Sequence, residues 1–488
     1  MWSNDAGNSL IIAETNVTAQ KITPSADNCF YITWQKSGIW GYSLYMQKVD
    51  TNGNILWPVD SPSIEGVLVY ARKVKQSTDY SVTIDKENNV YVGIDSGFIS
   101  STGEPTIGGK AVACKVSPNG ELLFGAAGII ISDADDIITP LVLATTTSDG
   151  NISFSWGVSN LTGYSDIIET VKIDTQGDII WRNKTRPLPV GDYLTINSLQ
   201  PSNDGSVVFS YLYTSPIDAG RSFTRDLKAK KLGGGDGSPL WDMSDDGSVY
   251  IYTHSGNAQG IINGVTPAVL PDNLGGFYFA TPGFEDESNN NIIYLQRINA
   301  DGLLKYTQNG VKITDENTHS QSEPVLSLDY EAQGLYILYR VSVSHGIPAQ
   351  LYNAVVAQYF DQEGNKQWGA SGITLDDYTT PEGIYSDPIA MLAYDGSAMA
   401  VWMPPVPATQ TYNAPIRTAL IDSRGEYIWD TGYVDVKTSA TQALYAAGTV
   451  NTDDTFSVIS WIDNIEAAQP DSQILRAQNI SKEGVLGL

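Results

Sequence analysis

The chain of 488 residues carries 28 Lys and Arg against 55 Asp and Glu, which gives a net charge of −27. An acidic surface of this kind repels phosphate groups, so nucleic acid and anionic membranes are excluded as expected partners. No apolar run reaches the roughly 18 residues of a membrane-spanning helix, and 45 glycines with 23 prolines suit many short strands joined by tight turns.

The first ten residues, MWSNDAGNSL, lack the basic start and the apolar centre of a signal peptide. The protein is therefore expected either to be intracellular or to follow a signal segment that has been removed. Residues 8–14, NSLIIAE, have the composition of a short strand, and Trp2 stands before them.

A phrase at residues 48–57, KVDTNGNILW, recurs along the whole chain, for example as KIDTQGDIIW, RINADGLLKY and LIDSRGEYIW. It predicts two strands joined by a polar turn that a glycine closes. The turn glycines are Gly53, Gly120, Gly177, Gly237, Gly302, Gly364, Gly425 and Gly484. Four residues later stand Trp57, Phe124, Trp181, Trp241, Tyr306, Trp368 and Trp429, and the last copy has Leu488.

About 25 residues before each glycine lies a polar turn followed by a strand rich in β-branched and aromatic residues. Six of these strands share an aromatic position, occupied by Trp34, Trp156, Tyr211, Tyr339, Trp402 and Trp461. One more strand precedes each turn and another follows the repeated phrase. Each unit therefore has four antiparallel strands, which we name A to D, in about 61 residues.

Eight such units with no spacer predict an all-β fold, an eight-bladed β-propeller that forms a single domain over residues 1–488. A seven-bladed propeller is the alternative. The repeated aromatic residues are expected to pack between blades, because a residue that is present in every blade cannot define one binding site. The eighth unit ends before its D strand, so residues 1–15 are predicted to supply the closing strand of the last blade and to remove open sheet edges.

The pattern K/R-I/V-D-x-x-G-x-x-x-W followed by G-V/I-x-I resembles the repeat of secreted and cell-surface propellers of Bacteroidetes-type bacteria. It is less similar to the repeats of deltaproteobacterial surface proteins, and WD40 and kelch repeats fit it worse. The resemblance covers essentially the whole chain. It implies a propeller and an exported location, which is extracellular, on the cell surface or periplasmic, and it implies no shared catalytic residues.

The A–B and C–D turns are short and alike in all units, so they are predicted to lie on one face, which we call the repeat face. The B–C and D–A connections differ most and form the opposite variable face, where ligand-binding residues are expected. The candidates in the B–C connections are Trp40, Tyr42, Tyr164, Arg221, Tyr352 and Tyr412. Exposed aromatic rings stack on sugar rings; alternatively, these rings only pack loop against loop.

The chain has three histidines, His254, His319 and His345, and all fall in connections of the variable face. Brought together, they would supply a general base or a metal site; the alternative is that they lie apart.

Asp242, Ser244 and Asp246 begin a calcium-loop pattern, but Thr253 stands where that pattern needs glutamate, so a polar loop is the simpler interpretation. No cofactor is predicted, with calcium the one left open. The two cysteines, Cys29 and Cys114, are expected to be free thiols, with a disulfide between them as the alternative.

The aromatic loops and the lack of a recognisable catalytic motif predict a monomeric, non-catalytic binding or scaffold propeller. Its expected ligand on the variable face is a carbohydrate or a protein. One alternative is a polysaccharide-acting enzyme, a lyase or a glycosidase, that uses the loop histidines. The other is a purely structural propeller whose partner is another chain.

Overall fold

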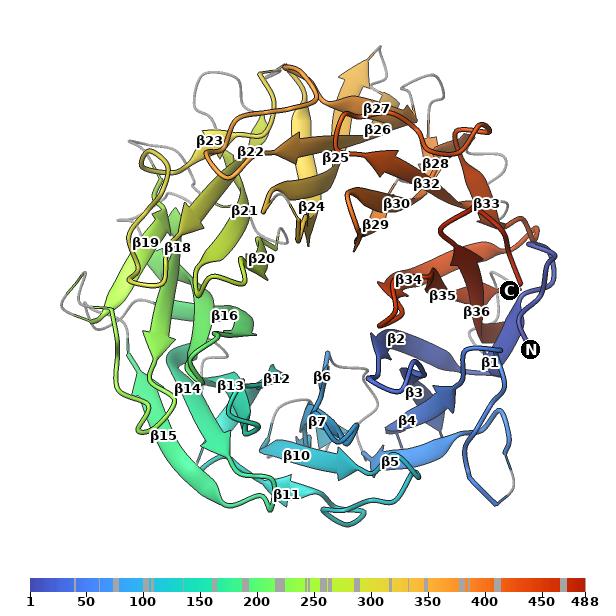
Figure 1. Ribbon diagram of the computed structural model, residues 1–488. Coiled ribbons are helices and arrows are strands. Elements are labelled where there is room, and N and C mark those ends of the chain that lie inside the picture. Colours follow the sequence, from blue (N-terminus) through green and yellow to red (C-terminus); the bar gives the residue numbers. More distant parts are fainter. Residues whose placement is uncertain are drawn as a thin grey trace.

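The computed structural model describes the chain except residues 39–40, 61, 73–78, 100–104, 107–108, 135, 160–164, 187–192, 216–223, 242–243, 245, 255–260, 262–265, 285–289, 316–317, 332, 346–349, 377–381, 385–386, 408–413, 466–471 and 488. The described residues form strands and no α-helix. Their antiparallel sheets stand around a central axis, which is the arrangement of a β-propeller (Figure 1). The all-β prediction is thus confirmed.

Six sheets have four strands each, which follow one another from the axis outward. They are β2 (Val17–Pro24), β3 (Phe30–Gly38), β4 (Gly41–Val49) and β5 (Val67–Ala71); β6 (Ser81–Ile84), β7 (Val90–Asp95), β10 (Ala111–Val116) and β11 (Ile129–Ile130); β20 (Ala268–Pro271), β21 (Phe277–Phe284), β22 (Asn291–Ile298) and β23 (Val311–Lys312); β24 (Ser320–Leu328), β25 (Leu335–His345), β26 (Gln350–Phe360) and β27 (Ile373–Asp376); β29 (Asp387–Tyr394), β30 (Ser397–Met403), β32 (Ile416–Asp422) and β33 (Val434–Lys437); and β34 (Gln442–Val450), β35 (Phe456–Asn464), β36 (Gln473–Ser481) and β1 (Leu10–Ala13).

The third and fourth units share one larger sheet instead of the two separate ones that the sequence predicts. Its strands are β12 (Ile137–Thr146), β13 (Ile152–Ser159), β14 (Ser165–Ile173), β15 (Ile179–Thr185), β16 (Tyr193–Pro201), β17 (Val207–Ser215), β18 (Thr224–Leu232) and β19 (Ser248–Tyr252). Only the pair Ser165↔Leu194 joins its two halves, because β16 begins early enough to reach the start of β14. Two short ribbons complete the described strands, β8 (Phe98–Ile99) with β9 (Pro105–Thr106) and β28 (Glu382–Ile384) with β31 (Val406–Pro407).

The N-terminal strand β1 lies in the same sheet as the last strands of the chain, and the two termini lie close together (Figure 1). It pairs antiparallel with β36 through Leu10↔Ala477 and Ile11↔Arg476. The amide of Gln478 donates to the carbonyl of Ser3 (2.6 Å), outside the strand itself. Residues from both ends of the chain therefore form one continuous sheet.

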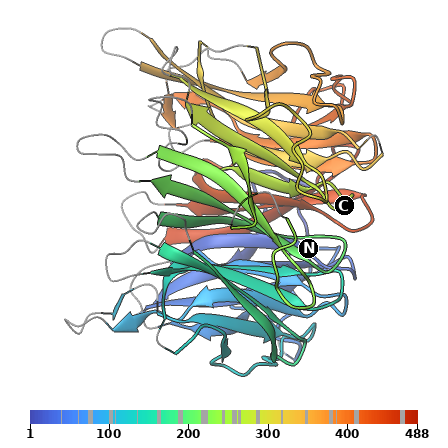
Figure 2. The same ribbon diagram turned by 90° about the vertical axis from the view of Figure 1, so that its left-hand side faces the viewer.

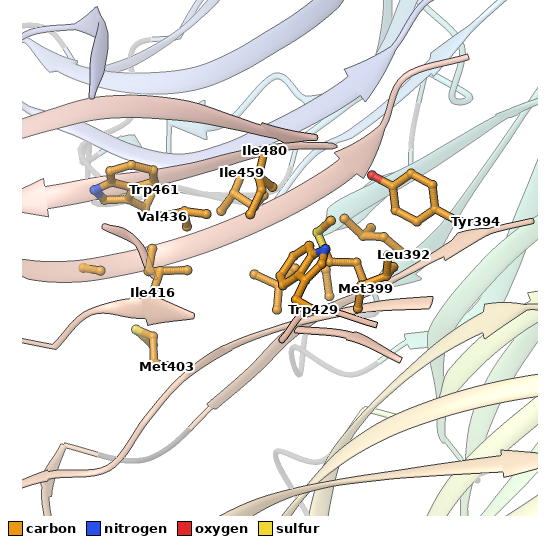
Figure 3. Close-up of a cluster of buried hydrophobic side chains, with 14 residues drawn as sticks. Leu392, Tyr394, Met399, Met403, Ile416, Trp429, Val436, Ile459, Trp461 and Ile480 are labelled. Atoms are coloured by element: carbon orange, nitrogen blue, oxygen red, sulfur yellow. The ribbon is translucent and has the colours of Figure 1, made fainter. Parts of the chain in front are cut away.

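The hydrophobic core lies between neighbouring sheets. Figure 3 shows one junction, where Met399 and Ile416 of one sheet meet Ile459 and Ile480 of the next, together with Trp429. The aromatic residues that the B strands share are all buried to 1% exposure or less: Trp34, Trp156, Tyr211, Tyr339, Trp402 and Trp461. Their predicted role in packing is confirmed.

The repeated phrase forms the C–D turn of each unit. In the first unit the Asp50 carboxylate accepts hydrogen bonds from the backbone N–H groups of Asn52 (2.9 Å) and Asn54 (2.7 Å). Gly53 completes the turn with a φ of +76°, in the left-handed region that a residue without a Cβ occupies at little cost. The aspartate and the glycine of the phrase are therefore turn residues.

The turn glycine of each unit packs on the aromatic ring of the preceding unit. A Cβ added to the glycine would lie 2.5–3.3 Å from that ring in all eight copies. The pairs are Gly53 with Trp2, Gly120 with Trp57, Gly177 with Phe124, Gly237 with Trp181, Gly302 with Trp241, Gly364 with Tyr306, Gly425 with Trp368 and Gly484 with Trp429. Trp2 thus serves the last unit as Trp57 serves the first.

All six tryptophans of this series also donate their ring N–H to a backbone carbonyl in the C–D turn of the next unit. The pairs are Trp2 to Thr51, Trp57 to Pro118, Trp181 to Gly234, Trp241 to Ala300, Trp368 to Ser423 and Trp429 to Lys482, at 2.8–3.2 Å. Each buried N–H is satisfied, and each ring fixes the position of the next sheet.

The basic residue that opens the phrase connects turns of neighbouring units. Lys172 Nζ pairs with Asp149 (2.6 Å) in its own A–B turn and donates to the carbonyls of Gly205 (2.8 Å) and Gly234 (3.1 Å) in the next unit. Arg297 makes a similar ion pair with Asp272 (2.9 Å). The basic residue, the aspartate, the glycine and the aromatic residue of the phrase thus all have architectural roles.

Candidate ligand-binding face

The variable face is built at the strand ends opposite the repeated turns. Figure 2 shows the sheets from the side, with the connections at their two ends. The N-terminus belongs to the repeat face, since the backbone N–H of Trp2 donates to the carbonyl of Asn52 in a C–D turn (3.1 Å). The ribbons β8–β9 and β28–β31 are described parts of the connections on the variable face.

Two of the six predicted ligand-binding residues fall in the described part of the chain. Tyr42 and Tyr352 are half-buried and lie in β4 and β26, in two different sheets. The prediction placed both in loops. This is wrong, because the B and C strands continue further toward the variable face, where Ser37 pairs with Tyr42 and Val343 pairs with Tyr352. The other four predicted residues, Trp40, Tyr164, Arg221 and Tyr412, lie outside the described residues.

The three histidines occupy separate places in the chain's topology. His254 follows β19, His319 precedes β24, and both are half-buried. His345 is the last residue of β25 instead of a loop residue, because that strand continues to its pair with Gln350; its side chain is not among those described.

His254 is held by a carboxylate. Its Nδ1 lies 2.7 Å from Asp226 Oδ1, and the same oxygen accepts the backbone N–H of His254 (2.9 Å). A carboxylate at Nδ1 fixes the ring orientation and directs Nε2 away from that carboxylate. The double contact also ties the chain after β19 to the start of β18.

An acidic cluster lies where the second and third units meet. The cluster consists of Asp133, Asp136 and Glu169. Among the described residues it is the only group of three Asp, Glu, His or Cys side chains that lie close enough together to share a metal ion. Lys184 Nζ pairs with Asp133 (2.6 Å) and Asp136 (2.9 Å). Burial alone would lower the pKa of Lys184, but these hydrogen bonds raise it to about 12. The ammonium group therefore takes the position that a cation would need.

Two of the three predicted calcium-loop residues, Ser244 and Asp246, lie just before β19. Ser244 Oγ donates to Asp246 (2.6 Å) and contacts the carbonyl of Ser248 (2.8 Å), while Lys228 Nζ lies 3.5 Å from Asp246. Burial alone would raise the pKa of Asp246, but the serine hydrogen bonds lower it to about 2. Asp242 lies outside the described residues. These contacts favour the polar-loop interpretation.

Both cysteines are free thiols, as predicted. Burial raises the pKa of Cys29 to about 11 and that of Cys114 to about 12, so at neutral pH both carry a proton and neither is activated as a nucleophile.

Ion pairs between neighbouring sheets gather at the strand ends of the variable face, and sequence reasoning missed them. Arg72 and Asp95 pair at 2.9 Å with both side chains at 1% exposure or less. Further pairs of this kind are Arg340 with Asp387 (2.5 Å) and Arg417 with Asp376 (3.1 Å). Arg476 and Asp463 (2.8 Å) form an ion pair within one sheet. No local motif reveals them, because each partner belongs to another strand or unit.

Lys437 is the most deeply buried cation among the described residues of this face. Its side chain has no exposed surface, and its Nζ donates to the carbonyls of Ala414 (3.1 Å), Ser439 (2.8 Å) and Thr441 (2.6 Å). Asp463 lies 3.9 Å away. Burial lowers the pKa of Lys437 to about 8 from its ordinary 10.5, although Asp463 opposes the shift.

This shift predicts a pH-dependent stability. Between pH 8 and 10.5 the unfolded chain binds more protons at Lys437 than the folded chain does. The contribution of Lys437 to the free energy of unfolding therefore rises with pH across that window and is constant below it. Between pH 7.5 and 9.5 the gain is about 2 kcal/mol. Urea unfolding of the native protein and of Lys437→Met at three pH values is expected to show this difference. A pH-independent difference between the two proteins would contradict the assignment.

No protein-family model and no curated protein matches the chain. Among solved structures, a eukaryotic initiation factor is 11% identical, with 99% of this chain and 89% of that chain covered and a TM-score of 0.44. The β-propeller domain of the trilobed protease of Pyrococcus furiosus is 10% identical, with 88% and 97% covered and a TM-score of 0.40. An α-L-arabinofuranosidase of Fusarium graminearum is 8% identical, with 83% and 92% covered and a TM-score of 0.38. Likeness at this level assigns neither a family nor an activity.

Proposed function

We propose that this protein is a monomeric, exported, eight-bladed propeller that binds a carbohydrate or a protein on its variable face without transforming it. The repeated contacts support the blade number. Eight turn glycines each pack on the aromatic ring of the unit before, and the series returns to its start through Trp2 and Gly53. In a ring of this kind the ligand site belongs to the connections that do not repeat.

The observation that carries the non-catalytic assignment is the pairing of charges at the variable face. Asp95, Asp387 and Asp376 are carboxylates at this face, and each is held by an arginine of the neighbouring unit. A general acid or base must reach the substrate and exchange protons with it. Carboxylates that are locked into sheet junctions in this way stabilise the face instead of exchanging protons with a ligand. None of the described residues forms a helix long and apolar enough to cross a membrane.

A glycan array read together with an assay for new unsaturated or reducing ends tests the proposal. Glycan binding without turnover is expected. Trp40→Ala and Tyr412→Ala are each expected to weaken binding about tenfold by loss of ring stacking. Tyr330→Ala is the matched control, because Tyr330 is 64% exposed and lies in the A–B turn between β24 and β25, on the repeat face. Turnover of a bound glycan would overturn the assignment, as would equal effects of all three variants.

The alternative function is a polysaccharide-acting enzyme, and one observation favours it. Asp226 orients His254 at Nδ1 as a carboxylate orients a catalytic histidine. If turnover is found, His254→Gln is expected to abolish it, since glutamine cannot exchange a proton. Turnover that survives this substitution would remove His254 from the reaction.

A further inference from the structure

The A–B turns of the third, fourth and fifth units meet at a half-open pocket of about 320 Å³ on the repeat face, opposite the proposed ligand face. It is lined by Thr147 and Ser148 of one turn, Ser202 and Asn203 of the next, and Pro271 and Asn273 of the third. The second and third turns abut, since a Cβ on Gly275 would lie 2.9 Å from Asn203 Oδ1. The volume is at the small end of the roughly 300–1,000 Å³ of ligand pockets.

Ser202 differs from the residues that open the equivalent turns. In the first unit Ser25 Oγ donates to Asp27 and contacts the Cys29 carbonyl (3.0 Å). In the third unit Thr147 Oγ1 donates to Asp149 (2.6 Å) and contacts the Asn151 carbonyl (2.9 Å).

In the fourth unit the corresponding carboxylate, Asp204, is taken by Ser206 through its backbone N–H (3.1 Å) and its hydroxyl. Ser202 is only 5% exposed, and its hydroxyl has no hydrogen-bond partner among the described residues. A buried hydroxyl without a partner costs about 1–3 kcal/mol. Ser202 lines the pocket, and rotation of its side chain about χ1 would bring this hydroxyl to a ligand hydroxyl, which would supply the partner.

The lining also defines the charge of the ligand. None of the described residues that line the pocket has a charged side chain. The nearby carboxylates of Asp204 and Asp272 are paired with Lys231 (3.0 Å) and Arg297 (2.9 Å). A charged ligand would therefore lose its hydration without gaining an ion pair.

We propose that this pocket binds one ring of a neutral sugar. Pro201 and Pro271 offer apolar surface to the C–H face of the ring. The Ser202 and Ser148 hydroxyls and the Asn203 and Asn273 amides offer hydrogen bonds to its hydroxyl groups. The inference does not depend on the ligand proposed for the variable face, because the two sites lie on opposite ends of the sheets.

Saturation-transfer NMR with the methyl glycosides of glucose, galactose, mannose and N-acetylglucosamine tests the proposal, with methyl glucuronide as the charged comparison. At least one neutral glycoside is expected to bind and the glucuronide is not. Ser202→Val is expected to raise the Kd about tenfold by removing the hydroxyl. Ser148→Trp fills the pocket from an exposed position and is expected to abolish binding.

Ser25→Val is the matched control, because it removes a hydroxyl at the same turn position outside the pocket and is expected to leave the Kd unchanged. Trp40→Ala on the variable face is also expected to have no effect on this site. Binding of none of the neutral glycosides would overturn the proposal. Equal binding of the glucuronide, or binding that survives both Ser202→Val and Ser148→Trp, would overturn it as well.

Discussion

Replacement of Gly237 by alanine is expected to lower the free energy of unfolding by about 2–5 kcal/mol. Gly237 has a φ of +69°, and a Cβ there would lie 2.5 Å from Cε3 of Trp181. The substitution therefore adds backbone strain to a steric clash with a ring that is only 6% exposed. Neither cost is relieved by a side-chain rotation, because the Trp181 N–H is fixed to the carbonyl of Gly234 (3.0 Å).

The same turn provides the matched control. Gly235 has no positive φ, and a Cβ added to it would meet none of the described atoms within 4 Å. Gly235→Ala is therefore expected to leave stability within about 0.5 kcal/mol of the native value. Urea unfolding of both variants measures the two costs. Similar losses for Gly235→Ala and Gly237→Ala would show that the glycine–aromatic contact is not what holds adjacent sheets together.

Much of the fold could be predicted from the sequence because its determinants are local and repeated. The spacing of the turn glycines and the aromatic residue four positions later predicted the C–D turn in every unit. The strand expected directly after the turn is wrong for seven units, where a single β-bridge such as Val49↔Ile55 takes its place, and among the described residues only β15 of the third unit is a strand there. Trp2 was recognisable as a repeat aromatic, although it lies at the opposite end of the chain from the unit it completes. Its contact with Gly53 follows the same pattern as that of Trp57 with Gly120.

Features that depend on two different units were not predictable. The pair Ser165↔Leu194 merges two sheets without any sequence signal. The buried pair Arg72–Asp95 joins residues that no common motif relates. Hairpin length was underestimated as well, because alternating Val and Ser residues before His345 continue the strand into what the repeat comparison placed in a loop.

The candidate site was less predictable than the fold for a physical reason. Ligand specificity comes from connections that differ between units, so the repeat that reveals the architecture contains no information about them. Ser202 illustrates this limit. Its sequence neighbourhood matches the other A–B turns, and only the pairing of Asp204 with Ser206 leaves its hydroxyl without a partner among the described residues.

The N-terminal segment is expected to contribute as much to stability as an internal part of the ring. Trp2 and Trp429 are both 7% exposed. Their ring N–H groups donate to Thr51 (2.8 Å) and Lys482 (2.9 Å), and each ring packs on a turn glycine. Removing a buried Trp side chain costs about 3–5 kcal/mol. Trp2→Ala and Trp429→Ala are therefore expected to cost about the same.

Calorimetric melting of these two variants tests ring closure most directly. If the first residues of the chain close the ring, Trp2→Ala and Trp429→Ala will lower the Tm by similar amounts in a single cooperative transition. If instead Trp429→Ala lowers the Tm while Trp2→Ala leaves it unchanged, the N-terminal segment is not part of the folded ring, and the account of its closure is wrong.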